Sequence, residues 1–126
     1  MSEQIAIDFG ELTVRAEWND SPAARRIARA LPIEARAHTW GEEVYFPIGL
    51  AMELTDAARS DMAVGEIAYW PAGQAFCIFF GPTPASQPGG GPRAASDVEP
   101  LGRILGDTDA LKSVADGQKV VLSAGQ

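Results

Sequence analysis

Hydrophobic and polar residues alternate along the first part of the chain. The pattern runs from Ile5 to Phe9 and, after Gly10, resumes from Leu12 to Trp18. A period of two on both sides of a glycine predicts two strands joined as a β-hairpin, with one face buried and one face in water.

Further strands are predicted by the same alternation or by short apolar runs between turn residues. They are expected over residues 33–38, 43–46, 48–54, 67–70, 75–80, 101–105 and 118–123, with a loop at 57–61. The run at 75–80 is almost continuously apolar, which is typical of a strand covered on both faces. The chain is therefore expected to contain about eight strands.

Two short helices are predicted between the strands. Ser21 is a favourable N-cap and Pro22 suits the first helical turn, so a helix is expected from Pro22 to Ala30. A second short helix is expected to begin near Asp107 or Thr108 and to continue through Val114. Because no long helices alternate with the strands, the pattern favours a mostly β fold with a closed or nearly closed barrel.

The length of 126 residues, 46% of them hydrophobic, suits one globular domain over residues 1–126. The segment Gln87–Pro92 contains three consecutive glycines between prolines, and it predicts a flexible surface loop over about residues 85–96. No internal repeat divides the chain.

The formal net charge of -7 argues against nucleic acid and against anionic membrane surfaces as partners. The N-terminal residues lack the pattern of a signal peptide, so a cytoplasmic location is expected. One cysteine and one histidine cannot supply a zinc site, and dinucleotide and P-loop motifs are absent, so no metal and no cofactor is predicted. Cys77 lies in the apolar run at 75–80 and is expected to be a buried, inert thiol.

The candidates for acid–base chemistry are few. His38 lies on the polar phase of its predicted strand, so its ring is expected to point to solvent. Glu42 and Glu43 are neighbours in an extended segment and should point to opposite faces, so at most one of them can serve a pocket.

Aromatic residues with polar companions gather in the middle of the chain. Tyr and Trp combine an apolar body with a polar group, which is the composition of a binding face as well as of a packed core. We interpret these aromatic residues as a ligand-binding pocket on the side of the barrel. Its predicted residues are Trp40, Glu42, Tyr45, Phe46, Tyr69, Trp70, Phe80 and Thr83.

Two blocks of sequence are similar to a known family. They are His38-Thr39-Trp40-Gly41-Glu42-Glu43-Val44-Tyr45-Phe46 and the stretch from Gly65-Glu66-Ile67-Ala68-Tyr69-Trp70-Pro71 to Phe79-Phe80-Gly81-Pro82-Thr83-Pro84. Together they resemble a prokaryotic family of small cyclophilin-like proteins of uncharacterised function. The resemblance continues into the segment 101–120 and covers nearly the whole chain. It implies an eight-stranded β-barrel closed by two helices.

Cyclophilins catalyse cis/trans isomerisation of Xaa–Pro bonds, whose barrier is about 18–20 kcal/mol. The resemblance implies an apolar proline pocket and an arginine that donates to the twisted amide. The corresponding stretch here, Tyr45-Phe46-Pro47, carries no arginine. A weak or atypical peptidyl-prolyl isomerase is therefore the alternative to the first hypothesis, a module that binds a small molecule or a peptide. An enzyme that uses Glu42 or His38 as a base is the third hypothesis.

Overall fold

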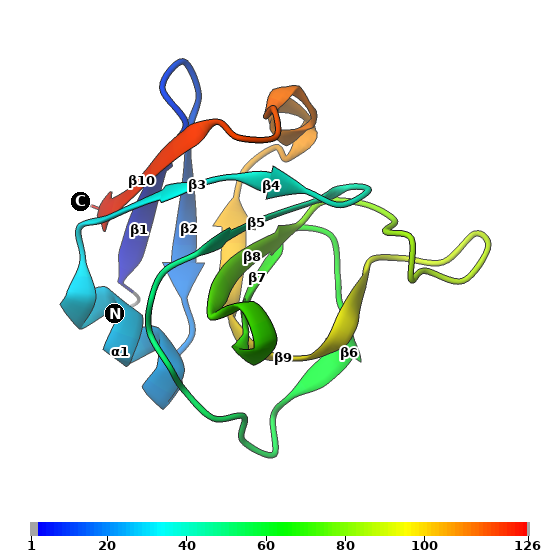
Figure 1. Ribbon diagram of the computed structural model, residues 1–126, viewed down its shortest axis with the longest axis horizontal. Coiled ribbons are helices and arrows are strands. Elements are labelled where there is room, and N and C mark those ends of the chain that lie inside the picture. The colour runs from blue at the N-terminus through cyan, green and yellow to red at the C-terminus, as the bar shows by residue number, and fades with distance from the viewer. Residues whose placement is uncertain (1–2, 126) are drawn as a thin grey trace.

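The chain is mostly β-structure in the computed structural model, which describes residues 3–125 (Figure 1). Ten strands are formed over these residues. They are β1 Gln4–Asp8, β2 Thr13–Trp18, β3 Ile33–Arg36, β4 His38–Thr39, β5 Glu43–Pro47, β6 Arg59–Asp61, β7 Glu66–Trp70, β8 Ala75–Phe79, β9 Arg93–Leu105 and β10 Lys119–Ala124.

The strands form one antiparallel sheet in the order β3-β10-β1-β2-β9-β7-β8-β5-β4, and β6 pairs separately with β9. The predicted N-terminal hairpin is confirmed, because β1 pairs with β2 and Ile7 lies opposite Val14. β9 is long enough to pair with β6 through its first half and with β2 and β7 through its second half.

The prediction of a mostly β chain is confirmed, but the hydrogen-bonded order is not a closed ring of eight strands. It is a path with β3 at one end and β4 at the other. These two strands follow each other in the chain and are separated by Ala37, whose backbone N–H donates to the carbonyl of Gln118 at 2.8 Å. One extended stretch therefore pairs with β10 through β3 and with β5 through β4.

The helix predicted over Pro22–Ala30 is confirmed as α1. Its N-cap is Ser21, whose Oγ accepts a hydrogen bond from the N–H of Ala24 at 3.1 Å. The predicted second helix is instead a short 3₁₀-helix, η2, over Asp109–Ser113. The turn before it and the turn at 115–117 leave room for little more than one helical turn. A second 3₁₀-helix, η1, spans Pro71–Gly73. Figure 1 shows α1 and η2 at opposite ends of the sheet.

Two clusters of buried side chains lie on opposite faces of the β5-β8-β7 part of the sheet. The main core contains residues from the β1–β2 hairpin, α1 and the inward faces of these strands, such as Phe46 and Phe76, whose rings stack at 5.2 Å. The second cluster, called the small core here, consists of Met62, Ala68, Cys77, Phe79, Ala94 and Val98, with Tyr45 and Trp70 packed against it. Strand β8 is fully buried because it contributes to both clusters.

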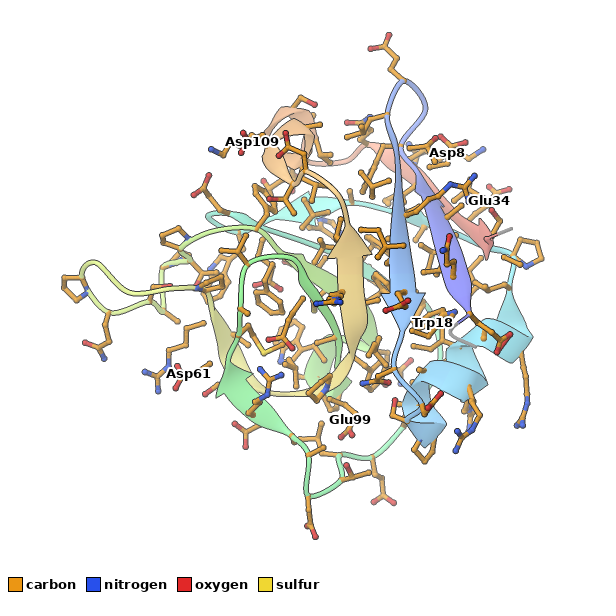
Figure 2. All side chains as sticks on the ribbon, turned by 180° about the vertical axis from the view of Figure 1, so that it is seen from behind. Asp8, Trp18, Glu34, Asp61, Glu99 and Asp109 are labelled. Carbon is orange, nitrogen blue, oxygen red and sulfur yellow. The ribbon has the colours of Figure 1, made fainter. Side chains whose placement is uncertain are left out.

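The prediction of a strand at 48–54 is wrong. This segment is irregular, and its backbone forms hydrogen bonds with a side chain from β7. Tyr69 donates its hydroxyl to the carbonyl of Leu50 at 2.5 Å and accepts from the N–H of Met52 at 3.2 Å. Further along, Thr55 donates through its N–H and Oγ1 to the buried carboxylate of Glu99, at 2.8 and 2.6 Å. Figure 2 shows Glu99 where β9 faces this segment. Part of the loop expected at 57–61 forms β6.

The glycine-rich segment forms a loop, but the last residues of the predicted range 85–96 belong to β9. Figure 1 shows the loop projecting from the body of the chain. Its base is closed by Thr83, whose Oγ1 donates to the carbonyl of Arg93, and by Ser86, whose Oγ donates to the carbonyl of Gly91 at 2.8 Å. No helix formed by residues 3–125 is long and apolar enough to cross a membrane.

Candidate functional site

A cavity of about 180 Å³ opens beside the small core, on the face of β5 and β7 that points away from the main core. Most of its wall is aromatic. It is lined by Trp40, Glu43, Tyr45, Trp70 and Ala95, and it is called the aromatic pocket below.

The alternation of side chains along β5 explains why Glu43 and Tyr45 both reach the pocket. Residues two apart in a strand share a face, so these two side chains project on one side of the sheet. Val44 and Phe46 project on the other side and are fully buried in the main core. Trp70 enters the pocket from β7, and Ala95 enters it from the first half of β9.

A tight turn places Trp40 next to Glu43. The N–H of Trp40 donates to the carbonyl of Glu43 at 2.9 Å, and the N–H of Glu43 donates to the carbonyl of Trp40 at 3.2 Å. Gly41 lies inside this turn with φ +60, and a Cβ there would come within 2.8 to 3.0 Å of atoms of residues 82–84. The turn therefore requires glycine both for its backbone conformation and for its close approach to the neighbouring chain.

Two aromatic rings of the pocket, those of Tyr45 and Trp70, are partly buried and held by side-chain contacts. Tyr45 and Trp70 meet edge to face, with ring centroids 6.0 Å apart and planes at 82°. The indole N–H of Trp70 donates to Oγ of Ser96 at 2.8 Å. The imidazole of His38, which is opposite Tyr45 in the β4–β5 pair, has its centroid 5.3 Å from that of Tyr45. The rings thus form a preformed wall, as expected of a ligand-binding concavity.

Among the residues that the structure describes, Glu43 is the one acidic side chain that lines this pocket, and only 5% of its surface is exposed. Burial raises the pKa of its carboxyl to about 7, and the thiol of Cys77 opposes this effect. Burial is also the main reason that the pKa of Cys77 lies well above its ordinary value, and the carboxyl of Glu43 raises it further. Cys77 is buried, as predicted. The pocket therefore combines apolar walls with a carboxyl that can gain or lose a proton near neutral pH.

The structure brings together three of the eight residues predicted for the site. Trp40, Tyr45 and Trp70 all line the aromatic pocket. Glu43 was missing from that set, although the opposite orientation of neighbouring glutamates indicated that only one of the pair could serve a pocket. In the structure Glu43 lines the pocket, because it lies on the same strand face as Tyr45.

Three other predicted residues lie in the main core. Phe46 and Tyr69 have no exposed surface, and Phe80 is 8% exposed. Phe46 and Tyr69 are direct sequence neighbours of Tyr45 and Trp70, so strand alternation turns them to the opposite face. The hydroxyl of Tyr69 is used to hold the segment 48–54.

The remaining two predicted residues have structural contacts elsewhere. Glu42 is half-exposed, and its carboxylate lies 3.9 Å from Nζ of Lys112 in η2. Thr83 is buried and closes the base of the glycine-rich loop. Neither residue is part of the lining of the aromatic pocket.

A wider and more open groove of about 600 Å³ runs beside β2, β7 and β9. Its charged residues include Arg59 and Glu66, which form a bidentate ion pair through Nη1–Oε1 at 2.9 Å and Nη2–Oε2 at 2.5 Å. Burial raises the pKa of Glu66, but the hydrogen bonds from Arg59 and the Ala63 N–H and the charge of Arg59 outweigh it, so this pKa is lowered. These two charges neutralise each other, whereas Glu17 and Arg103 of the same groove are in no ion pair among the described residues.

No group of three or more His, Cys, Asp or Glu side chains within residues 3–125 is arranged to hold a metal ion. No arginine is among the pocket-lining residues that the structure describes. In the described chain, the first arginine after β5 is Arg59. It is paired with Glu66 in the wider groove.

Comparison with known proteins shows to which family the chain belongs. The family model described as Cyclophilin-like matches residues 3–123. The chain belongs to the cyclophilin-like family. This confirms the resemblance noted in the two sequence blocks around Trp40 and Trp70.

A solved structure supports the same conclusion for this cyclophilin-like chain. The chain is similar to the solution structure of the hypothetical protein AF2241 from Archaeoglobus fulgidus, with 37% sequence identity and a TM-score of 0.84. The similarity covers 98% of this chain and 95% of the archaeal one. No curated protein matches the chain.

Proposed function

We propose that this cyclophilin-like chain is a binding module that takes a small molecule or a peptide side chain into the aromatic pocket. The observation that carries the proposal is the meeting of three partly exposed aromatic side chains, Trp40, Tyr45 and Trp70, around one cavity. A volume of about 180 Å³ is below the usual range of about 300–1,000 Å³ for whole drug-sized ligands. The pocket therefore suits a small group, such as one side chain or one end of a metabolite.

The lining of the pocket favours binding over prolyl isomerisation. An isomerase needs a donor for the twisted amide, and electrostatic stabilisation of this kind is commonly worth about 3 kcal/mol of barrier. The described lining offers the acceptor Glu43 and no guanidinium. A protease-coupled assay with an Ala–Pro peptide is expected to show no rate above background at high protein concentration. A rate that Tyr45→Ala abolishes would favour the isomerase instead.

The three tryptophans allow a direct binding test. Trp40 and Trp70 line the pocket, whereas Trp18 is buried in the main core and meets the edge of Phe76 at 6.3 Å. A ligand library is screened by the indole N–H signals in ¹H–¹⁵N NMR spectra. A pocket ligand is expected to shift two of the three signals and to leave Trp18 unchanged. If no compound or proline-containing peptide shifts Trp40 and Trp70 selectively, the binding proposal fails.

A further inference from the structure

The position of the Glu43 carboxyl in the aromatic pocket indicates the charge of the ligand. The side chain is 95% buried, and no Lys or Arg within residues 3–125 forms an ion pair with it. The thiol of Cys77 lowers the pKa of this carboxyl, but a thiol is a weak donor, and its hydrogen bond goes to the carbonyl of Ala75 at 4.0 Å. A buried carboxylate normally has a cationic partner or several hydrogen-bond donors. The pocket side of Glu43 is where such a partner can be supplied.

The walls of the pocket favour the same charge. The faces of Trp and Tyr rings carry partial negative charge and attract cations that lie within about 6 Å. Trp40, Tyr45 and Trp70 thus act in the same direction as the carboxyl on the floor. The net charge of -7 adds a long-range attraction for cations.

The pocket has few hydrogen-bond acceptors, and this limits which kind of cation it can bind well. A primary ammonium carries three N–H donors, and each donor that is buried without an acceptor costs free energy. The side chains of the described lining supply two acceptor groups, the carboxyl of Glu43 and the hydroxyl of Tyr45, among aromatic rings. An alkylated ammonium has few or no N–H donors, and its methyl groups pack directly against aromatic rings.

From these observations, and resting on the proposed binding function, we propose that the aromatic pocket recognises an alkylated ammonium group, with Trp40, Tyr45 and Trp70 around the cation and Glu43 beneath it. The raised pKa of Glu43 supports this assignment, because a bound cation would favour the ionised carboxyl. The group can belong to a free quaternary amine or to a methylated lysine of a peptide.

A pair of matched probes tests the charge requirement. Choline and 3,3-dimethylbutan-1-ol have the same shape, but the second carries carbon in place of the charged nitrogen. Both are titrated at pH 8 while the Trp40 and Trp70 indole signals are followed. Choline is expected to bind at least about tenfold more tightly, which corresponds to about 1.4 kcal/mol from the Glu43 carboxylate and the aromatic rings together.

Two matched variants test the role of the carboxyl. Glu43→Gln is expected to weaken choline binding and to lower the ratio of choline affinity to alcohol affinity, because it removes the carboxylate and leaves the rings in place. Glu42→Gln removes a neighbouring carboxylate that faces Lys112, and it is expected to retain the preference. Both variants are first checked for folding by the dispersion of their NMR spectra.

The outcomes separate this inference from the proposed function. If the neutral alcohol binds as tightly as choline, the pocket binds ligands but the assignment of a cation is overturned. If Glu43→Gln keeps the full preference for choline, the role of Glu43 beneath the cation is overturned. A peptide carrying trimethyllysine, compared with its unmodified form, distinguishes a peptide source from a free amine. If neither choline nor this peptide moves the Trp40 and Trp70 signals, the assignment is overturned, whatever other ligand the pocket takes.

Discussion

The buried carboxyl of Glu43 and the buried thiol of Cys77 interact across the antiparallel strands β5 and β8: the thiol lowers the pKa of the carboxyl, and the carboxyl raises the pKa of the thiol. Both side chains are buried, with exposures of 5% and 1%. The pair joins the floor of the aromatic pocket to the small core, because Glu43 lines the pocket and Cys77 belongs to the cluster behind it. The protonation of one group therefore affects the environment of the other.

The stability of the fold should depend on pH through Glu43. Its pKa is about 7 in the folded chain, against an ordinary value of 4.5, so the folded state binds more protons between these two values. The free energy of unfolding is therefore expected to fall as pH rises from 4.5 to 7, by about 3 kcal/mol from this group alone. Urea unfolding of the wild type and of Glu43→Gln across this range measures the difference. Parallel curves for the two proteins would contradict the prediction.

The thiol of Cys77 should resist alkylation in the folded chain. It is buried and its pKa lies well above the ordinary value, so the reactive thiolate is scarce at neutral pH. Modification by iodoacetamide is expected to be at least about a hundredfold slower in buffer than in denaturant, where the ordinary thiol pKa returns. Mass spectrometry of timed samples measures both rates. Rapid modification of the native protein would show that the thiol is accessible.

The two tyrosines should differ sharply in the effect of losing a hydroxyl. Tyr69→Phe leaves the Leu50 carbonyl and the Met52 N–H without their partner, and it is expected to cost about 1–3 kcal/mol of unfolding free energy. Tyr45→Phe changes a partly exposed pocket residue and is expected to cost less than about 0.5 kcal/mol. Chemical denaturation of both variants tests the pair. Equal losses would mean that the Tyr69 hydroxyl does not hold the segment 48–54.

A glycine in β9 should be far less tolerant than one in the glycine-rich loop. Gly102 has φ +148, and a Cβ on it would overlap the carbonyl oxygen of Glu17 in the neighbouring strand. Gly102→Ala is therefore expected to cost more than about 3 kcal/mol. Gly89 also has positive φ, but nothing lies within 4 Å of its Cβ position. Gly89→Ala is expected to cost only about 1 kcal/mol. Thermal unfolding of both variants checks this order, and a reversed order would contradict the packing described for β9.

Local features of the fold could be predicted from the sequence because neighbouring residues determine them. The hairpin over β1 and β2 follows from a period of two around Gly10, and α1 follows from the Ser21-Pro22 start. The segment 48–54 could not be predicted this way. Its alternating apolar residues suggest a strand, but its backbone groups are held by Tyr69, which lies far away in the sequence.

The pocket could be predicted in part. The density of aromatic residues indicated a site that contains Trp40, Tyr45 and Trp70. The same argument also included Phe46 and Tyr69, which the structure places in the main core. Strand alternation, which correctly separated Glu42 from Glu43, separates these neighbouring pairs as well. The sequence could not show which face of β5 opens to solvent, because this depends on where the first half of β9 lies.

Strand β8 has no face left over for water, since one side belongs to the main core and the other to the small core beneath the pocket. A ligand in the pocket therefore acts, through Glu43 and its neighbour Cys77, on a strand that is buried on both faces and not on an exposed loop. Ligand binding is therefore expected to slow hydrogen exchange at the β8 amides and to raise the melting temperature of the protein. A change of ligand preference made at Glu43 or Cys77 is therefore expected to alter the stability of the fold as well, whereas a change at the partly exposed Trp40, Tyr45 or Trp70 is expected to alter it less.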